Sequence, residues 1–189
     1  MVDNGTLSIR HPPSKPTGFQ LMHVFDIADF RDNDLWIDSK NIQDPAACEV
    51  LAEFLEEHHS RVGVVLVEFP SNATQRHKDL YACSKRIQAT GARTSYYVPT
   101  DKGLACSADS RRQSTACVEL EQALRLAVES GLFTDFSFDF SSYSAMKEIP
   151  ISSALRWNTW SINLRDFESF PRSRFGFVIV DTSDDPNGY

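Results

Sequence analysis

Residues 63–69 of the chain are GVVLVEF, an apolar run rich in β-branched residues that Pro70 ends. A continuous apolar run of this length is typical of a strand covered on both faces, as in a parallel sheet. The residues before it predict a helix, because Asp44 is a suitable N-cap and Pro45 fits the first helical position. One apolar stripe would then face the core, formed by Val50, Leu51, Phe54 and Leu55.

The same alternation extends in both directions from this strand. Downstream, the pattern predicts a helix over 72–89 that Gly91 ends, a strand over 94–98, a helix from Ser114 or Thr115 to Gly131, and a strand over 133–140. Upstream, residues 19–27 (FQLMHVFDI) predict a buried first strand followed by an acidic loop. The pattern weakens over 143–156, a short helix broken at Pro150, and over 157–164, a strand or an aromatic loop, before a strand at 174–181.

Strands that alternate with helices predict an α/β fold with a mostly parallel sheet of five or six strands. We expect helices on both faces of a doubly wound sheet, with an incomplete (β/α) barrel-like array as the alternative. A complete eight-unit barrel typically needs about 250 residues, and this chain has 189. Residues 1–18, which are rich in proline, predict a flexible N-terminal arm, and residues 19–189 a single α/β domain.

The composition is that of a globular protein, with 41% hydrophobic and 24% charged residues. The formal net charge of −7 opposes the binding of phosphate backbones, so no nucleic-acid partner is expected. No apolar run approaches the roughly 20 residues of a membrane span, so no membrane partner is expected either. The binding partners that we expect are therefore a small-molecule substrate or a protein.

The four cysteines, Cys48, Cys83, Cys106 and Cys117, show no CxxC spacing. Three of them fall in or beside predicted helices, where they resemble small core residues. Two disulfides are the alternative, but no signal peptide is visible at the N-terminus, so a cytoplasmic location is expected.

Carboxylates follow the predicted strands at their carboxyl ends, which form a common edge where ligands bind in α/β sheets. The candidate catalytic residues are Asp26, Glu68, Asp139 and Asp181, and Asp29, Ser71 and Asn72 are binding candidates beside them. Acids gathered at one edge repel each other unless a cation compensates them. The alternative is that each acid caps the element that follows it.

A divalent metal ion, Mg²⁺ first, would be the simplest compensating cation, with Asp26 and Asp181 as its predicted ligands. One carboxylate could hold the ion while another activates water. The sequence therefore predicts a metal-assisted hydrolase or lyase that acts on a small polar or phosphorylated substrate. The alternative is a non-catalytic protein-interaction or ligand-binding module. Walker, GxGxxG, GxSxG and HExxH motifs are absent from the sequence.

A second candidate site is the segment Trp157-Asn158-Thr159-Trp160. The two tryptophans could form a platform for a sugar ring or a base, with Arg156 and Arg165 near an anionic group. The alternative is that they are core aromatics or a dimer contact.

Asp26, Ser71-Asn72 and the terminal Asp181 to Asp185 resemble the first, second and fourth motifs of haloacid-dehalogenase-type phosphohydrolases. The resemblance would imply a nucleophilic Asp26. The second aspartate of that family's first motif is replaced here by Ala28, and the resemblance covers only these short segments. It does not assign the chain to that family.

Overall fold

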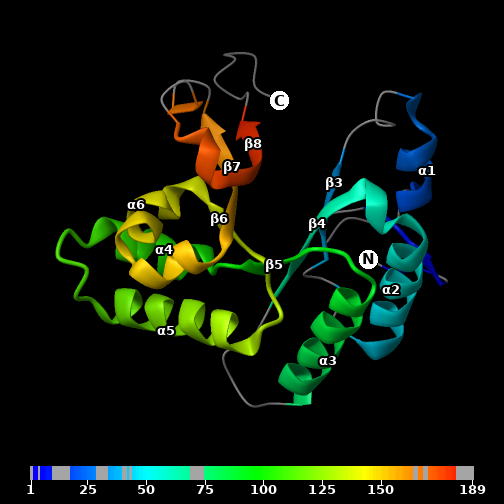
Figure 1. The fold of residues 1–189 in the computed structure, drawn as a ribbon, viewed down its shortest axis with the longest axis horizontal. Coiled ribbons are helices and arrows are strands. Elements are labelled where there is room, and N and C mark those ends of the chain that lie inside the picture. The colour runs from blue at the N-terminus through cyan, green and yellow to red at the C-terminus, as the bar shows by residue number, and fades with distance from the viewer. Residues whose placement is uncertain are drawn as a thin grey trace. The chain divides into compact units, whose positions relative to one another are not determined.

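The computed structural model describes residues 2–3, 5–9, 18–28, 34–39, 42, 44–68, 75–163, 166–167 and 170–181. The chain divides into two compact units, Met1–Thr94 and Ser95–Tyr189. Each unit has its own helices and strands (Figure 1). Each also has its own buried residues.

The first unit pairs two parallel strands, β3 and β4, and carries a separate two-stranded antiparallel ribbon, β1 with β2. Its elements are β1 (Val2–Asp3), β2 (Thr6–Leu7), α1 (Leu21–Asp26), β3 (Leu35–Asp38), α2 (Pro45–His58), the 3-10 turn His59–Arg61, β4 (Val62–Val67) and α3 (Gln75–Ala89). The carboxylate of Asp44 accepts the N–H of Ala47 at 2.8 Å, so the predicted cap of α2 is confirmed.

Helices α2 and α3 pack side by side (Figure 1). Leu51 and Leu55 of α2 and Leu80 and Ile87 of α3 are almost completely buried, as the apolar stripes of both helices require. On the solvent side, the Arg86 guanidinium pairs with the Glu49 and Glu56 carboxylates of α2.

The second unit contains four parallel strands that lie side by side in the order of the sequence, β5-β6-β7-β8. Its elements are β5 (Thr94–Tyr97), α4 (Thr100–Ala108), α5 (Thr115–Ser130), β6 (Asp135–Asp139), the 3-10 turn Phe140–Ser142, α6 (Tyr143–Glu148), the 3-10 turn Pro150–Ala154, β7 (Arg156–Asn163), the 3-10 turn Arg172–Arg174 and β8 (Phe175–Asp181). The Ser114 hydroxyl caps α5, and Gly131 ends it with a φ of 66°.

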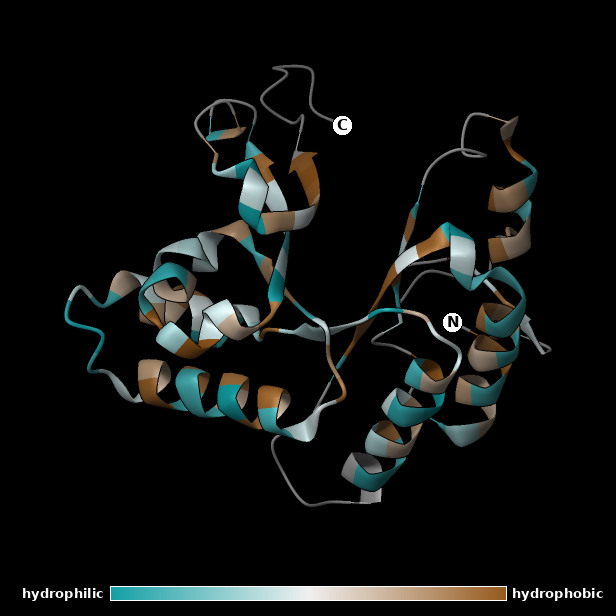
Figure 2. Cartoon of the chain, viewed as in Figure 1, coloured by the Kyte–Doolittle hydropathy of each residue, from teal (hydrophilic) through white to brown (hydrophobic). Residues whose placement is uncertain are grey.

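Large apolar side chains line one face of the strands in the second unit. Phe136, Phe138 and Trp157 are each at most 1% exposed. The ring of Tyr143, from α6, lies edge-on to Trp157. The opposite face carries the polar side chains of Ser95, Ser137 and Asn158 together with the rings of Tyr97 and Trp160. Figure 2 shows apolar and polar residues alternating along these elements.

The predicted fold class is confirmed: the chain is an α/β protein with six parallel strands, two in the first unit and four in the second. A doubly wound sheet reverses its strand order at a switch point. The four strands of the second unit follow the sequence order without such a reversal. A strand order that follows the sequence is the order expected for an incomplete (β/α) barrel-like array. That array is the alternative that the sequence analysis gave.

The strand predicted over residues 19–27 is wrong, because this segment forms helix α1. Leu21, Val24 and Phe25 have helical spacing, and only Phe25 of this helix is buried. The N–H of Gln20 donates to Nδ1 of His23, which closes the first turn. This largely apolar segment is therefore as compatible with a surface helix that buries one aromatic ring as with a buried strand.

Four strands and helices fall where no element was predicted, and two of them, β1 and β2, lie within residues 1–18. Strand β3 lies within the predicted acidic loop, where the apolar residues Leu35 to Ile37 pair in parallel with β4. Helix α4 contains Gly103, a residue that disfavours helices. The structure explains this glycine, because a Cβ at position 103 would lie 2.1 Å from Oγ of Ser142.

The expectation of unpaired cysteines is also wrong. Cys48 is bonded to Cys83, which joins α2 to α3, and Cys106 is bonded to Cys117, which joins α4 to α5. All four side chains are buried. The absence of a CxxC spacing therefore did not indicate free thiols, because each partner lies on a neighbouring helix.

None of the helices within the described ranges has both the length and the apolar composition needed to cross a membrane.

Candidate functional site at the carboxyl edge of the second unit

Three neighbouring strands of the second unit end with side chains that can bind a ligand. β5 ends at Tyr97, β6 at Asp139, and β7 passes Trp160 before it ends at Asn163. Asp139 and Trp160 are opposite each other in the register of β6 and β7. Because these strands are parallel, all three residues lie at the carboxyl edge, where ligands bind in α/β proteins.

The rings of Tyr97 and Trp160 are stacked, with their centroids 5.7 Å apart and their planes inclined by 10°. The Tyr97 hydroxyl is 3.0 Å from Oγ1 of Thr100, the first residue of α4, and this hydrogen bond fixes the phenol ring. Both rings are partly exposed. A rigid aromatic pair of this kind offers apolar area at a low entropic cost.

A bulge in β7 follows Trp160 directly. The register between β7 and β8 shifts between Thr159 and Ile162, and Ser161 has a φ of 59°. A positive φ at a non-glycine residue costs free energy, and residues strained in this way cluster at functional sites. Bulges commonly redirect a side chain beside such sites. Here the bulge adjoins the residue that stacks on Tyr97.

Asp139 uses one carboxylate oxygen for the local backbone. Its Oδ1 accepts the N–H of Ser141 at 2.9 Å and so caps the 3-10 turn that follows β6. No hydrogen bond to Oδ2 is recorded from the residues that the structure describes, and the side chain is partly exposed. The capping role weighed for the acidic residues therefore holds for Asp139, with one oxygen left for a ligand.

Helix α4 approaches this turn closely. Gly103 faces Ser142, whose hydroxyl is buried and makes no hydrogen bond within the described part of the chain. Only glycine permits this distance, because any Cβ there would overlap the serine side chain. The contact sets the distance between α4, which carries Thr100, and the turn that Asp139 caps.

A buried polar network supports the site from the interior of the sheet. The hydroxyls of Ser95 and Ser137 are 2.5 Å apart, and Nδ2 of Asn158 donates to both. Oδ1 of Asn158 accepts the N–H of Phe177 at 3.0 Å. These contacts link β5, β6, β7 and β8, so the strands that carry Tyr97, Asp139 and Trp160 are held in one register.

The two tryptophans predicted as a platform point to different environments. Trp157 is 1% exposed, and its indole N–H donates to the carbonyl of Ser152 at 2.6 Å. The Arg174 guanidinium lies over its ring at 4.2 Å. Trp157 thus occupies the core, as the alternative interpretation had it, whereas Trp160 pairs with Tyr97.

The other predicted site residues are distributed between the two units. Asp26 is exposed at the end of α1, and Glu68 is partly buried just after β4, both in the first unit. Asp181 ends β8 opposite Asn163, but its side chain is not described. Asp29, Ser71, Asn72 and Arg165 lie outside the described residues. Arg156 begins β7, at the opposite end of the strand from Trp160.

Within the described ranges, no three His, Cys, Asp or Glu side chains are grouped as ligands for a metal ion. The sequence interpretation placed Thr100 just past a strand end, but it missed Tyr97 as a candidate binding residue. A usable signal was present, because Tyr97 lies two residues before Pro99 at the end of a predicted strand. The stacking partner of Tyr97 could not be inferred, since it depends on the register of β7.

No protein-family model and no curated protein sequence matches this chain. Among solved structures, the crystal structure of an alpha-amylase from Lactobacillus plantarum is similar over 85% of this chain and 52% of its own. The sequence identity is 11% and the TM-score is 0.41. The chain therefore spans about half the length of that structure, and a likeness of this degree assigns no activity to it.

Proposed function

We propose that the second unit binds a small, neutral ligand with a hydroxyl-bearing ring, such as a sugar, at its carboxyl edge. The observation that carries this proposal is the stacked pair Tyr97–Trp160 beside Asp139, whose Oδ2 accepts no hydrogen bond from the described part of the chain. An aromatic face packs against the C–H face of a sugar ring. A carboxylate accepts hydrogen bonds from sugar hydroxyls, and such charge-assisted bonds are stronger than neutral ones.

The charges near this edge favour a neutral ligand over a phosphorylated one. Asp139 would repel a phosphate group. Lys102, in the first turn of α4, is already paired with Glu119 at 2.8 Å. Arg156 lies at the other end of β7. A neutral ring with several hydroxyls is not repelled by Asp139 and needs no lysine or arginine to bind it.

Titration of the full chain with neutral sugars, followed by tryptophan fluorescence and by ¹H–¹⁵N NMR, tests this proposal. The panel would contain glucose, galactose, mannose and their disaccharides, with uridine and glucose 6-phosphate for comparison. We expect at least one neutral sugar to bind, and we expect Trp160→Ala to weaken its binding by about tenfold. Trp36→Phe, in the first unit, is the matched control and should leave binding unchanged.

Asp139→Asn separates the two roles of this residue. Asparagine can still accept the N–H of Ser141, so the turn stays capped, whereas the charge on the open oxygen is lost. We expect the sugar to bind about tenfold more weakly and the thermal midpoint to change little. Binding that is indifferent to both Trp160→Ala and Asp139→Asn would overturn the proposal, as would failure of every neutral sugar to bind.

The metal-assisted hydrolase or lyase is the second candidate function. It is favoured by the open oxygen of Asp139, which could accept a proton from water or a substrate, or hold Mg²⁺. Its test is a thermal melt with and without millimolar Mg²⁺, Mn²⁺ and Ca²⁺, on the parent and on Asp139→Asn. A metal-dependent rise that the variant abolishes would support a metal at this edge, and a phosphoesterase screen would then follow.

The cytoplasmic location expected from the sequence stays a prediction, and the paired cysteines oppose it. Disulfides persist in oxidising compartments and are rare in the cytosol, where thiols are kept reduced. Cys48–Cys83 and Cys106–Cys117 account for all four cysteines of the chain. We therefore propose that the protein folds in an oxidising compartment.

A further inference from the structure

Helix α4 (Thr100–Ala108) packs against the rest of the second unit through few side chains. Gly103 and Cys106 are its buried residues, whereas Leu104 is 53% exposed. A helix of nine residues is not stable by itself in water, and a glycine inside it lowers its stability further. Specific contacts must therefore hold α4 in its place.

Three contacts hold the last turn of α4. The Cys106–Cys117 disulfide joins this turn to α5, with the two Cα atoms 4.7 Å apart. The Arg112 guanidinium donates to the carbonyl oxygens of Cys106 and Ser107. The hydroxyl of Ser107 accepts the N–H of Ala145, in α6, at 3.1 Å. The disulfide is the covalent contact among these, and water cannot replace it as it can replace a hydrogen bond.

The first residue of α4 belongs to the proposed site. Oγ1 of Thr100 is 3.0 Å from the hydroxyl of Tyr97, whose ring is stacked on Trp160. The N-cap at this end of the helix is Pro99, which offers no side-chain hydrogen bond to the first turn. The place of Thr100 therefore depends on contacts further along α4, and the disulfide is one of them.

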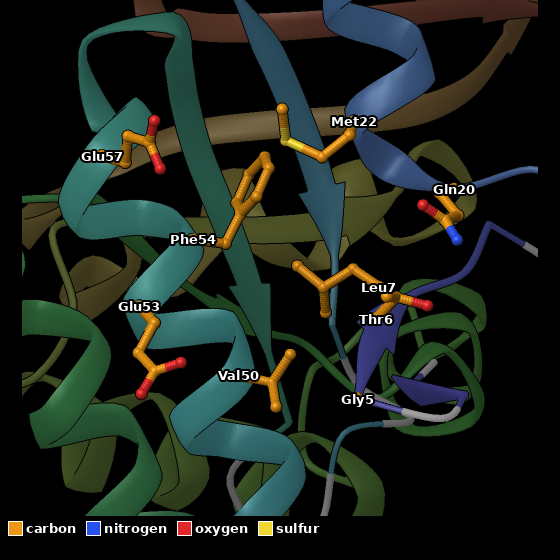
Figure 3. Close-up of a pocket in the computed structure, with 9 residues that line it drawn as sticks. All are labelled: Gly5, Thr6, Leu7, Gln20, Met22, Val50, Glu53, Phe54 and Glu57. Atoms are coloured by element: carbon orange, nitrogen blue, oxygen red, sulfur yellow. The ribbon is translucent and has the colours of Figure 1, made fainter.

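The other disulfide, Cys48–Cys83, joins helices that are better packed. Helix α2 buries five of its 14 residues, one of which is Cys48 itself. The side chains of Val50 and Phe54 line an open groove of about 260 Å³ beside the N-terminal ribbon, so α2 contacts this ribbon as well as α3 (Figure 3). Loss of this disulfide should therefore lower the stability of the first unit without releasing α2.

We propose that the Cys106–Cys117 disulfide is a redox switch for the carboxyl edge of the second unit. When the disulfide is formed, α4 is fixed and Thr100 holds the Tyr97 ring against Trp160. When it is reduced, the last turn of α4 loses its covalent contact, and Thr100 no longer orients Tyr97. The site is then complete only under oxidising conditions. The inference rests on the proposed function for its ligand, but the change in α4 belongs to the free protein.

A dithiol reductant operates the switch. One thiolate of the reductant attacks a sulfur of the disulfide and forms a mixed disulfide, and the second thiol of the reductant then closes the reductant's own disulfide. The protein S–S bond is replaced by the thiols of Cys106 and Cys117, and the reductant supplies two electrons and two protons. Both cysteines are buried, so the attack requires α4 to open locally. A short helix with two buried residues opens at a lower cost in free energy than the packed helix α2.

The test uses the full chain without ligand in three forms: the parent, Cys106→Ala with Cys117→Ala, and Cys48→Ala with Cys83→Ala. Amide hydrogen exchange reports on α4, and the NMR signal of the Trp160 indole N–H reports on the stacked pair. In the first double variant, we expect the hydrogen-bonded amides of α4 to exchange about tenfold faster relative to those of α5. The indole signal of Trp160 should shift in that variant and stay in place in the second.

The second double variant is the matched control for a general loss of stability. The Cys48–Cys83 disulfide closes the longer loop, with a separation of 35 residues against 11, so its removal should lower the free energy of unfolding more. A merely structural role of the disulfides would make this variant the more affected of the two. The disulfide that remains in it can also be reduced with a dithiol and re-oxidised, and the Trp160 signal should move and return.

The ligand provides the second readout. A neutral sugar that binds the parent should bind about tenfold more weakly to the variant that lacks Cys106 and Cys117, and with unchanged affinity to the variant that lacks Cys48 and Cys83. If no sugar binds the parent, the proposed function fails, whereas hydrogen exchange and the Trp160 signal still decide on the switch.

The switch is overturned if α4 exchanges at the parent rate without its disulfide, or if Trp160 responds equally to the loss of either disulfide. A sugar that binds equally to the oxidised and reduced forms would overturn it as well. Far-UV circular dichroism checks that each variant is folded. A chain that does not fold without Cys106 and Cys117 would also reject the switch, because the disulfide would then support the whole unit.

Discussion

Oδ1 of Asn158 accepts the backbone N–H of Phe177 at a distance of 3.0 Å, so a buried side chain of β7 replaces a carbonyl in the ladder between β7 and β8. The register of these strands shifts between Trp157 and Asn158, and again between Thr159 and Ile162. A register shift leaves backbone groups without their regular partners. Asn158 supplies the partner for one of them, and its amide nitrogen bonds to the hydroxyls of two strands beyond β7.

Asn158→Ala should therefore destabilise the second unit strongly. The change leaves the N–H of Phe177 and two buried hydroxyls with fewer partners and creates a cavity, for which we expect a loss of about 3 kcal/mol in the free energy of unfolding. Chemical denaturation with a linear extrapolation measures it.

Asn163→Ala is the matched control for Asn158, because it removes the same amide from the end of the same strand. Among the described residues, the side chain of Asn163 bonds to the neighbouring Asp166 at the surface, so the loss should be about 1 kcal/mol or less. Equal losses for the two variants would show that the Asn158 network does not hold the strands together.

Gly103→Ala should disturb the approach of α4 to the turn that Asp139 caps. The added methyl group would lie 2.1 Å from Oγ and 2.6 Å from Cβ of Ser142, so one element must move. We expect a loss of about 2 kcal/mol in spite of the better helix propensity of alanine. Ser142→Gly in the same chain should recover most of it, because the nearest remaining atom, Cα of residue 142, is 3.7 Å away.

Gly131→Ala is the control for this pair. The φ of 66° at Gly131 makes alanine unfavourable there by about 1 kcal/mol, with no side chain within 4 Å. Ser142→Gly should not recover that loss. A recovery at position 131 equal to that at position 103 would argue against a direct contact between Gly103 and Ser142.

The sequence predicted most elements because their signals are local. The Asp44 cap, the strand of the run 63–69 and the Ser114-to-Gly131 helix each depend on neighbouring residues. The structure contains the cap and the helix, and it forms the strand over Val62–Val67. The segment 19–27 was mistaken for a strand because an apolar run of nine residues satisfies both spacings, and only its burial distinguishes them. Helix α4 was missed because Gly103 is explained by a residue 39 positions later.

The site could be predicted only in part. The sequence identified Asp139 and Trp160 as candidate site residues because each belongs to a predicted strand or strand end. The position of a residue along a strand can be read from the sequence. The pairing of Trp160 with Tyr97 depends on the register between β6 and β7 and on the bulge at Ser161.

The loop between α4 and α5 should give the second unit a dependence on acidic pH. The backbone N–H groups of Ser114 and Arg111 donate to the Asp109 carboxylate and hold its pKa below the ordinary value for aspartate. A carboxyl group with a lowered pKa in the folded state stabilises the fold above its unfolded pKa. This stabilisation is lost as the pH falls below about 4, toward the folded pKa.

A ¹³C NMR titration of the Asp109 carboxyl group measures this directly. Asp109→Asn should flatten the fall of unfolding free energy with acid, because asparagine does not titrate. Ser114→Ala keeps the backbone N–H that is the main cause, so the pKa of Asp109 should stay low in that variant. An Asp109 that titrates at or above the ordinary aspartate value in the parent would contradict the prediction.

The two disulfides should stabilise the chain unequally, because they close loops of different length. Cys106 and Cys117 are 11 residues apart and Cys48 and Cys83 are 35 apart. Closing these loops in the unfolded chain predicts contributions of about 3 and about 4 kcal/mol. The double variants Cys106→Ala with Cys117→Ala, and Cys48→Ala with Cys83→Ala, should lose these amounts in chemical denaturation. Before that comparison, the unfolded but unreduced parent should react with no thiol reagent, and should react at four sites per chain after reduction. Labelling before reduction would contradict the pairing itself, and with it the oxidising compartment inferred from it.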